Sequence, residues 1–173
     1  NLLESARAAK IDRLIFSSTA AVYGNPPVVP VTEAAPINPI NPYGASKLVT
    51  ERMLADLSAA EAAFRYVSLR YFNVAGADPG GRIGQSTAQA TLLTKVACEV
   101  AVGKRPHVSI FGTDYATPDG TGIRDYIHVE DLATAHLDAL RYLRRGGEPT
   151  VLNRGYGHGY SVRAVIDAVD RAA

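Results

Sequence analysis

Two side chains at helical spacing, Tyr43 and Lys47, form the part of this chain best suited to proton transfer. Four residues separate them, so both leave a helix on the same face, one turn apart. A phenol has a reference pKa of about 10 and is a poor base at neutral pH, but a neighbouring lysine cation favours the phenolate. The pair is therefore predicted to act as a general base toward the hydroxyl of a sugar or an alcohol.

The local sequence predicts how this pair is positioned. Asn41 is a suitable N-cap, and Pro42 suits the first helical position, where its missing N–H would have no partner. Upstream, residues 13–17 are typical of a buried strand that runs into a turn of small and polar residues. Ligands of parallel sheets lie at the carboxyl ends of strands, so Ser18 and Thr19 are expected where chemistry takes place.

Strands and helices alternate along the chain. Strands are predicted at residues 13–17, 64–71, 108–111, 124–129 and 150–153. Helices are predicted before residue 11 and at 42–58, 87–102, 130–143 and 161–172. A proline-rich loop, residues 25–41, is either a connector or a wall of the cleft between Thr19 and Tyr43. This order of elements predicts an α/β fold with a mainly parallel sheet.

The composition of the 173 residues is typical of a globular protein. Hydrophobic residues make up 47%, charged residues 20%, and the net charge of +1 gives no reason to expect a nucleic-acid partner. No apolar run approaches the roughly 18 residues of a membrane span. The single cysteine, Cys98, excludes an internal disulfide and fits a reducing compartment, so we expect a cytoplasmic protein. The four histidines lack metal-ligand spacing, and no metal site is predicted.

Four segments resemble the extended short-chain dehydrogenase/reductase superfamily, in which a Ser or Thr, a Tyr and a Lys act together at a nicotinamide cofactor. The segments are residues 19–24 (TAAVYG), 43–47 (YGASK), 69–73 (LRYFN) and 114–129 (DYATPDGTGIRDYIHV). Within the superfamily the resemblance is to the UDP-glucose 4-epimerase family, and it runs over nearly the whole chain. It implies an isomerase that interconverts UDP-glucose and UDP-galactose through reversible oxidation at sugar C4, with NAD held throughout the cycle.

The resemblance also implies an organisation and a set of catalytic roles. Residues 1–75 would be the remaining half of a Rossmann-like, doubly wound NAD-binding domain. Residues 76–173 would be part of a smaller substrate-binding domain, with elements near 124–173 partly returning to the first. By the same resemblance Tyr43 is the base, Lys47 tunes it and binds the nicotinamide ribose, and Thr19 hydrogen-bonds the same sugar hydroxyl. Phe72 matches the position that touches the nicotinamide.

The substrate-binding positions implied by the resemblance are Thr19, Asn73, Leu92, Ser109, Ile110, Phe111 and Arg124. Asn73 and Arg124 match the ligands of the UDP diphosphate, where an arginine makes a charge-assisted contact. Residues 109–111 match a strand that lies against the uracil. Leu92 departs from the Asn or His usual at its position, so any contact there must use backbone groups.

Several alternatives remain open at this level. Dehydratases of the superfamily place an Asp-Glu pair after the strand-end threonine, whereas Ala20-Ala21 stands there. Epimerases of UDP-xylose/arabinose or of UDP-glucuronate, and a non-catalytic UDP-binding fragment, are not distinguished. The G-x-G-x-G of residues 155–159 has the wrong spacing for a dinucleotide fingerprint and is expected to be a strand-to-helix turn capped by Ser161.

No Gly-rich dinucleotide-binding unit opens the chain. It is therefore expected to be a fragment that neither binds NAD tightly nor epimerises UDP-sugars alone. Relatives commonly dimerise through a helix like that predicted at 42–58, so a homodimer is expected.

Overall fold

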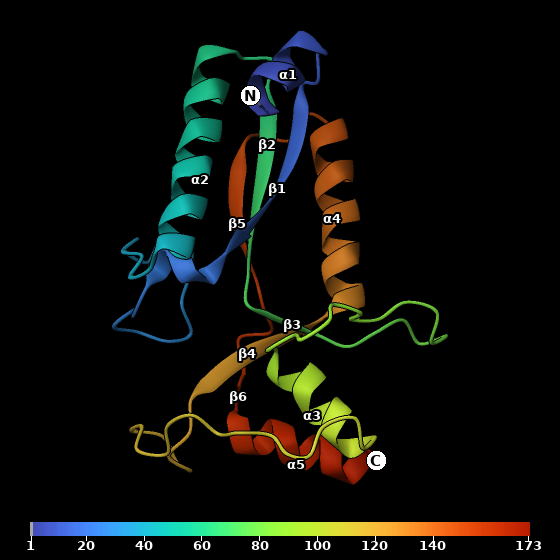
Figure 1. Ribbon diagram of the computed structural model, residues 1–173. Coiled ribbons are helices and arrows are strands. Elements are labelled where there is room, and N and C mark those ends of the chain that lie inside the picture. Colours follow the sequence, from blue (N-terminus) through green and yellow to red (C-terminus); the bar gives the residue numbers. More distant parts are fainter. Residues whose placement is uncertain (1) are drawn as a thin grey trace. The chain divides into compact units, whose positions relative to one another are not determined.

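The computed structural model describes residues 2–173, which form two compact units (Figure 1). Unit 1 contains the chain up to Phe72 together with Asp131–Gly155. Unit 2 contains Asn73–Glu130 and Tyr156–Ala173. The predicted α/β class with a parallel sheet is confirmed. No helix among residues 2–173 is both long enough and apolar enough to cross a membrane.

Unit 1 is built on a parallel sheet of three strands in the order β1-β2-β5. The strands are β1 (Arg13–Thr19), β2 (Arg65–Tyr71) and β5 (Thr150–Arg154). The register sets Thr19 opposite Tyr71, and Tyr71 opposite Arg154. The carboxyl ends of all three strands therefore meet at one edge of the sheet, where a ligand of a parallel sheet is expected.

Helices cover both faces of this sheet because strand residues alternate between apolar clusters. On one face, α2 (Pro42–Ala60) and α1 (Leu2–Ala8) lie on the strands (Figure 1), and Leu54 of α2 packs with Phe64 and Tyr66. On the other face lies α4 (Val129–Arg144), whose Ala139 and Leu143 pack with residues 67 and 69 of β2. Side chains two apart in a strand share a face, so Ser68 and Arg70 point toward α2.

Helix α2 begins as its sequence predicts. The Asn41 side-chain oxygen accepts a hydrogen bond from the Gly44 N–H at 2.8 Å, and Pro42 occupies the first turn. The helix ends at Ala60, two residues later than predicted. Ser58 donates to the Phe64 carbonyl at 2.9 Å, which closes the short connection to β2.

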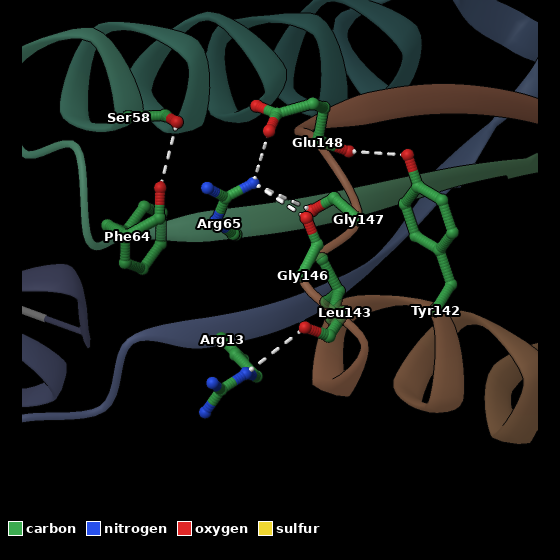
Figure 2. A network of polar contacts seen from close by, with 9 residues as sticks. All are labelled: Arg13, Ser58, Phe64, Arg65, Tyr142, Leu143, Gly146, Gly147 and Glu148. Carbon is green, nitrogen blue, oxygen red and sulfur yellow. Dashed lines mark hydrogen bonds and ion pairs between the residues drawn. The ribbon is translucent and has the colours of Figure 1, made fainter.

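The amino-terminal ends of the strands are held by the loop between α4 and β5 (Figure 2). Arg65 donates to the carbonyls of Gly146 and Gly147 at 3.0 and 3.2 Å, and it pairs with Glu148 at 2.7 Å. Arg13 donates to the Leu143 carbonyl at 3.3 Å. These contacts tie β1, β2 and α4 together at the end of the sheet away from Thr19.

Unit 2 contains short strands and two helices that pack on each other. Strand β4 (Ile123–His128) pairs in parallel with β3 (Asn73–Ala75) and antiparallel with β6 (Gly159–Ser161). The helices are α3 (Leu93–Ala101) and α5 (Val162–Ala172). Ser161 caps α5 as predicted, because its hydroxyl accepts from the Ala164 N–H at 3.1 Å.

Two predicted elements of unit 2 need correction. The helix predicted at 87–102 begins only at Leu93, because Gln89 has a φ of 56° and so takes a left-handed conformation that breaks helical backbone. The strand predicted at 108–111 is not formed: this segment is assigned to no strand and pairs with none of the described strands. A short apolar run becomes a strand only where a partner satisfies its backbone.

Candidate active site

Thr19 ends β1 and begins a short 3-10 helix, Ala20–Tyr23. Its backbone is still extended, and its hydroxyl oxygen accepts a hydrogen bond from the Ala21 N–H at 3.1 Å. The residue is 8% exposed. This cap fixes the Thr19 hydroxyl at the carboxyl end of the sheet, and the hydroxyl proton is not used in that bond.

Lys47 links α2 to the end of β1. Its ammonium donates to the Ser17 carbonyl at 3.0 Å, and it lies 5.2 Å from the centre of the Phe16 ring. The same ammonium lies 5.8 Å from the centre of the Tyr43 ring, one helical turn earlier. An ammonium has three donors, so Lys47 keeps donors beyond the one used by Ser17. Tyr43 is 55% exposed, which leaves its phenol open to a substrate.

Gly44 allows the first turn of α2 to lie directly on the residues that follow Thr19. A Cβ at Gly44 would lie 2.6 Å from the Ala21 carbonyl oxygen. This close approach sets Tyr43 beside the strand end that carries Thr19. Thr19, Tyr43 and Lys47 are therefore brought together at one edge of unit 1.

We expect Gly44→Ala to destabilise this junction, although alanine is the better helix former. The new methyl group meets backbone that cannot move freely, and overpacking of this kind costs about 1–3 kcal/mol against a helix gain of up to about 1 kcal/mol. Thermal and urea unfolding measure the difference. Gly84→Ala is the matched control, because a Cβ there meets only the Ala77 Cβ at 3.6 Å. Equal stability of the two variants would contradict the close contact.

A buried ion pair lies behind the site and was not predicted from the sequence. Glu51 of α2 is 5% exposed and Arg70 of β2 is 6% exposed. The guanidinium of Arg70 bonds both carboxylate oxygens of Glu51, at 2.5 Å from its terminal nitrogen and at 2.9 Å from Nε. The Ser18 hydroxyl also donates to Glu51, at 2.5 Å. Removing one partner of such a pair typically costs about 3–5 kcal/mol.

Arg70 continues this network toward the third strand. It donates to the Tyr23 hydroxyl at 2.9 Å, and Tyr23 donates to the Asn153 side chain of β5 at 2.7 Å. Burial acts to lower the pKa of Arg70, but the hydrogen bonds to Glu51 and Tyr23 outweigh it and raise that pKa above its ordinary value. The arginine is therefore charged at every pH at which the protein is folded.

The proline-rich loop reaches the same strand. The Asn153 N–H donates to the Glu33 carboxylate at 2.7 Å, and its side chain donates to the Val31 carbonyl at 3.0 Å. The loop leaves β1 after Tyr23 and is held at the carboxyl end of β5. Residues 25–40 thus lie along the edge of the sheet that carries Thr19.

Phe72 follows β2 at the same edge. It is half-buried, and its N–H donates to the Arg154 carbonyl at 3.4 Å, which extends the pairing of β2 with β5 by one residue. Unit 1 thus offers a phenol, an ammonium, a hydroxyl and an aromatic ring at one edge. These groups fit a nicotinamide ribose, which needs hydrogen-bonding groups for its hydroxyls and a flat apolar surface for its base.

In unit 2, strand pairing brings two of the predicted substrate residues close together. Asn73 of β3 donates to the Asp125 carbonyl of β4 at 3.3 Å. Arg124, the preceding residue of β4, is exposed, and its guanidinium donates to the Ile123 carbonyl at 2.7 Å. Such a guanidinium has further donors for an anionic ligand.

The other predicted substrate residues lie in separate segments of unit 2. Leu92 is 50% exposed and precedes the first turn of α3. Ser109 and Phe111 are exposed and Ile110 is half-buried, in a segment outside the described strands. Main-chain pairing among the described strands therefore includes neither Leu92 nor residues 109–111.

Two structural observations limit where else a ligand site can be sought. A hollow of about 640 Å³ is lined by residues that include Arg141, Tyr142 and Arg145. It lies beside the loop of Figure 2, at the amino-terminal ends of the strands, so it is not part of the Thr19 edge. Among residues 2–173, no three His, Cys, Asp or Glu side chains are grouped as a metal ion would require.

The chain is similar to known proteins over almost its whole length. Residues 1–155 match the NAD dependent epimerase/dehydratase family. The chain is 60% identical, over 99% of its length, to the UDP-glucose 4-epimerase of Azospirillum brasilense, of which it covers 49%. It is 48% identical to the UDP-glucose 4-epimerase of Rhizobium meliloti and covers 52% of that protein. The chain thus spans about half the length of these curated relatives.

Solved structures give the same result. The UDP-glucose 4-epimerase of Brucella ovis in complex with NAD superposes with a TM-score of 0.94 at 45% identity, over 98% of this chain and 52% of that one. The enzyme of Bifidobacterium longum in complex with NAD+ and UDP has a TM-score of 0.93 at 44% identity, over 99% and 51%.

Proposed function

The chain belongs to the NAD dependent epimerase/dehydratase family, and from this premise we propose that the protein that carries it interconverts UDP-glucose and UDP-galactose. The observation that carries the proposal is the meeting of Thr19, Tyr43 and Lys47 at the carboxyl edge of unit 1. The relatives that share this chain at 60% and 48% identity are UDP-glucose 4-epimerases.

Each side chain has a role that follows from its position. The Tyr43 phenol, exposed and beside Lys47, takes the proton of the sugar 4-hydroxyl and later returns it. The Lys47 ammonium favours the phenolate by its charge and donates to the nicotinamide ribose. Thr19 hydrogen-bonds the same sugar hydroxyl, and Phe72 lies against the nicotinamide. NAD, when bound, accepts a hydride from sugar C4 and gives it back to the other face of the sugar.

Unit 2 supplies the proposed nucleotide contacts. Asn73 and Arg124 lie on paired strands and would bind the diphosphate, with Arg124 as its charged partner. The segment 109–111 would lie along the uracil through its backbone groups, and Leu92 would use backbone only. Domain roles follow, with residues 1–75 as part of the NAD-binding domain and 76–173 as substrate-domain segment that partly returns to it.

Assembly and location are proposed in the same way. We propose a homodimer through α2, whose outer face exposes Val49 (54%) and Met53 (52%). Apolar side chains that remain exposed on one helix face are typical of an interface. The single cysteine supports a reducing, cytoplasmic location.

The direct test is to supply UDP-galactose to the protein that carries this chain and follow formation of UDP-glucose, with bound NAD counted by its absorbance after denaturation. The proposal expects turnover without net oxidation of the sugar. Turnover of UDP-xylose or UDP-glucuronate but not of UDP-galactose would replace it with one of the related epimerases. Binding of UDP without any turnover would show a non-catalytic nucleotide-binding role.

Arg124→Ala should weaken nucleotide binding in that protein. Loss of a hydrogen bond from a cation to the diphosphate should raise KM for UDP-glucose by about 2 kcal/mol, or roughly thirtyfold. Arg82→Ala is the matched control, because Arg82 is an exposed arginine of unit 2 that pairs with Asp78 at 2.9 Å. Unchanged KM and unchanged inhibition by UDP in Arg124→Ala would assign Arg124 to the fold alone.

A further inference from the structure

The buried Glu51–Arg70 pair lies one helical turn beyond Lys47 and contacts β1 at the residue before Thr19. We propose that Glu51 and Arg70 are positioning residues, which set how α2 lies on β1 and so hold the Lys47 ammonium at Ser17 and Tyr43 beside Thr19. The inference rests on the proposed function for the roles of Tyr43 and Lys47. Neither Glu51 nor Arg70 is expected to touch substrate or cofactor.

Three contacts on one face of α2 fix its position on the end of β1. Gly44 lies against the Ala21 carbonyl, Lys47 donates to the Ser17 carbonyl at 3.0 Å, and Glu51 accepts from the Ser18 hydroxyl at 2.5 Å. Residues spaced by three and four positions share one helix face. Two of these contacts are directional hydrogen bonds, so they define the rotation of the helix as well as its distance from the strand.

Arg70 makes the third contact rigid. Its two-point bond to the Glu51 carboxylate fixes the plane of that group, as a single hydrogen bond would not. Arg70 is itself held by the Tyr23 hydroxyl at 2.9 Å, and Tyr23 is held by Asn153. The orientation of α2 is thereby tied to β2, β5 and the 3-10 helix after Thr19.

The pair also leaves no unbalanced charge behind the site. The titratable groups around Glu51 are Arg70 and Tyr66 of β2, Tyr23 of the 3-10 helix and Lys47 in α2. Burial raises the pKa of Tyr66, while the charges of Glu51 and Arg70 act on it in opposite directions. Without Arg70, the Glu51 carboxylate would compete with the Tyr43 phenolate for the Lys47 ammonium.

Two buried serines allow a matched test in the protein that carries this chain. Ser18→Ala removes the hydroxyl that joins β1 to Glu51. Ser68→Ala removes an equally buried hydroxyl of β2 that has no hydrogen-bond partner among the described residues. We expect Ser18→Ala to lower kcat roughly tenfold by misplacing the pair, with KM for UDP-glucose unchanged, and Ser68→Ala to leave both constants unchanged.

A stronger variant removes both charges together. Glu51→Gln with Arg70→Met leaves no unpaired buried charge, and we expect it to fold and to lose roughly 10²-fold in kcat. The acidic limb of its pH–rate profile should move to higher pH by about half a unit or more, because Lys47 no longer favours the phenolate fully. A merely structural role would lower kcat at every pH by the unfolded fraction and leave the shape of the profile unchanged.

A crystal structure of Ser18→Ala decides the inference without any assay. The Lys47 Nζ–Ser17 O distance, 3.0 Å here, should open beyond about 3.5 Å. An unchanged distance together with an unchanged pH profile in folded variants would overturn the positioning role. If the unmodified protein epimerises no UDP-sugar, the proposed function fails, whereas this distance still decides whether the network positions Lys47.

Discussion

Replacing Tyr43 by Phe in the protein that carries this chain should lower kcat for UDP-glucose by about 10²–10⁴, the usual effect of losing a positioned general base. The change removes only the hydroxyl and keeps the ring. Because Tyr43 is 55% exposed, its hydroxyl contributes little to folding. Unfolding temperature and bound NAD per protein should therefore stay close to those of the unmodified protein while turnover falls.

Tyr142→Phe is the matched control for this prediction. It also removes one tyrosine hydroxyl, which donates to the Glu148 carbonyl at 3.0 Å at the other end of unit 1 (Figure 2). This control should turn over normally. Near-normal turnover in Tyr43→Phe as well would rule out the phenol as the base, and residues 41–47 would then be only the beginning of a helix.

The sequence predicts the local part of this site because local chemistry determines it. Asn41 and Pro42 define where α2 begins, and the helical period then places Lys47 one turn after Tyr43. The strands of unit 1 are predicted within a residue or two because each is a short run of mainly apolar and β-branched residues bounded by turns. These features depend on neighbours within a few positions, so one sequence suffices to find them.

The Glu51–Arg70 pair was missed because it depends on contacts between distant segments. A helical period does continue from Tyr43 and Lys47 to Glu51, and this was the one available signal. A glutamate at such a position is usually solvated, however, and only the register of β1 with β2, which sets Ser18 opposite Arg70, shows that it is buried. Burial of a charge is a property of the assembled sheet.

The wrong predictions in unit 2 have a similar cause. Residues 108–111 have the composition of a strand, but strand formation also needs a partner, and none of the described strands pairs with them. The early start predicted for α3 ignored the left-handed backbone at Gln89. A nonglycine residue with positive φ gives little warning in sequence, because its conformation is imposed by the surrounding structure.

Lys47→Met separates the role of the ammonium from that of the phenol. Methionine keeps most of the length and the apolar contact with Phe16, and the lost hydrogen bond to Ser17 costs only about 1 kcal/mol, so the variant should fold. Bound NAD should decrease because the ribose loses a donor. The phenolate of Tyr43 also loses its nearest cation, so the acidic limb of the kcat profile should move about 1–2 pH units to higher pH.

The measurement is kcat against pH with bound NAD counted at each point, and Lys95→Met is the control. Lys95 pairs with Glu99 at 3.1 Å in unit 2, so its loss should leave the profile unchanged. Saturating NAD separates the two effects of Lys47→Met, since it restores occupancy but not the charge beside Tyr43. Activity recovered by NAD at every pH would limit Lys47 to cofactor binding, whereas a persistent shift assigns it to the base.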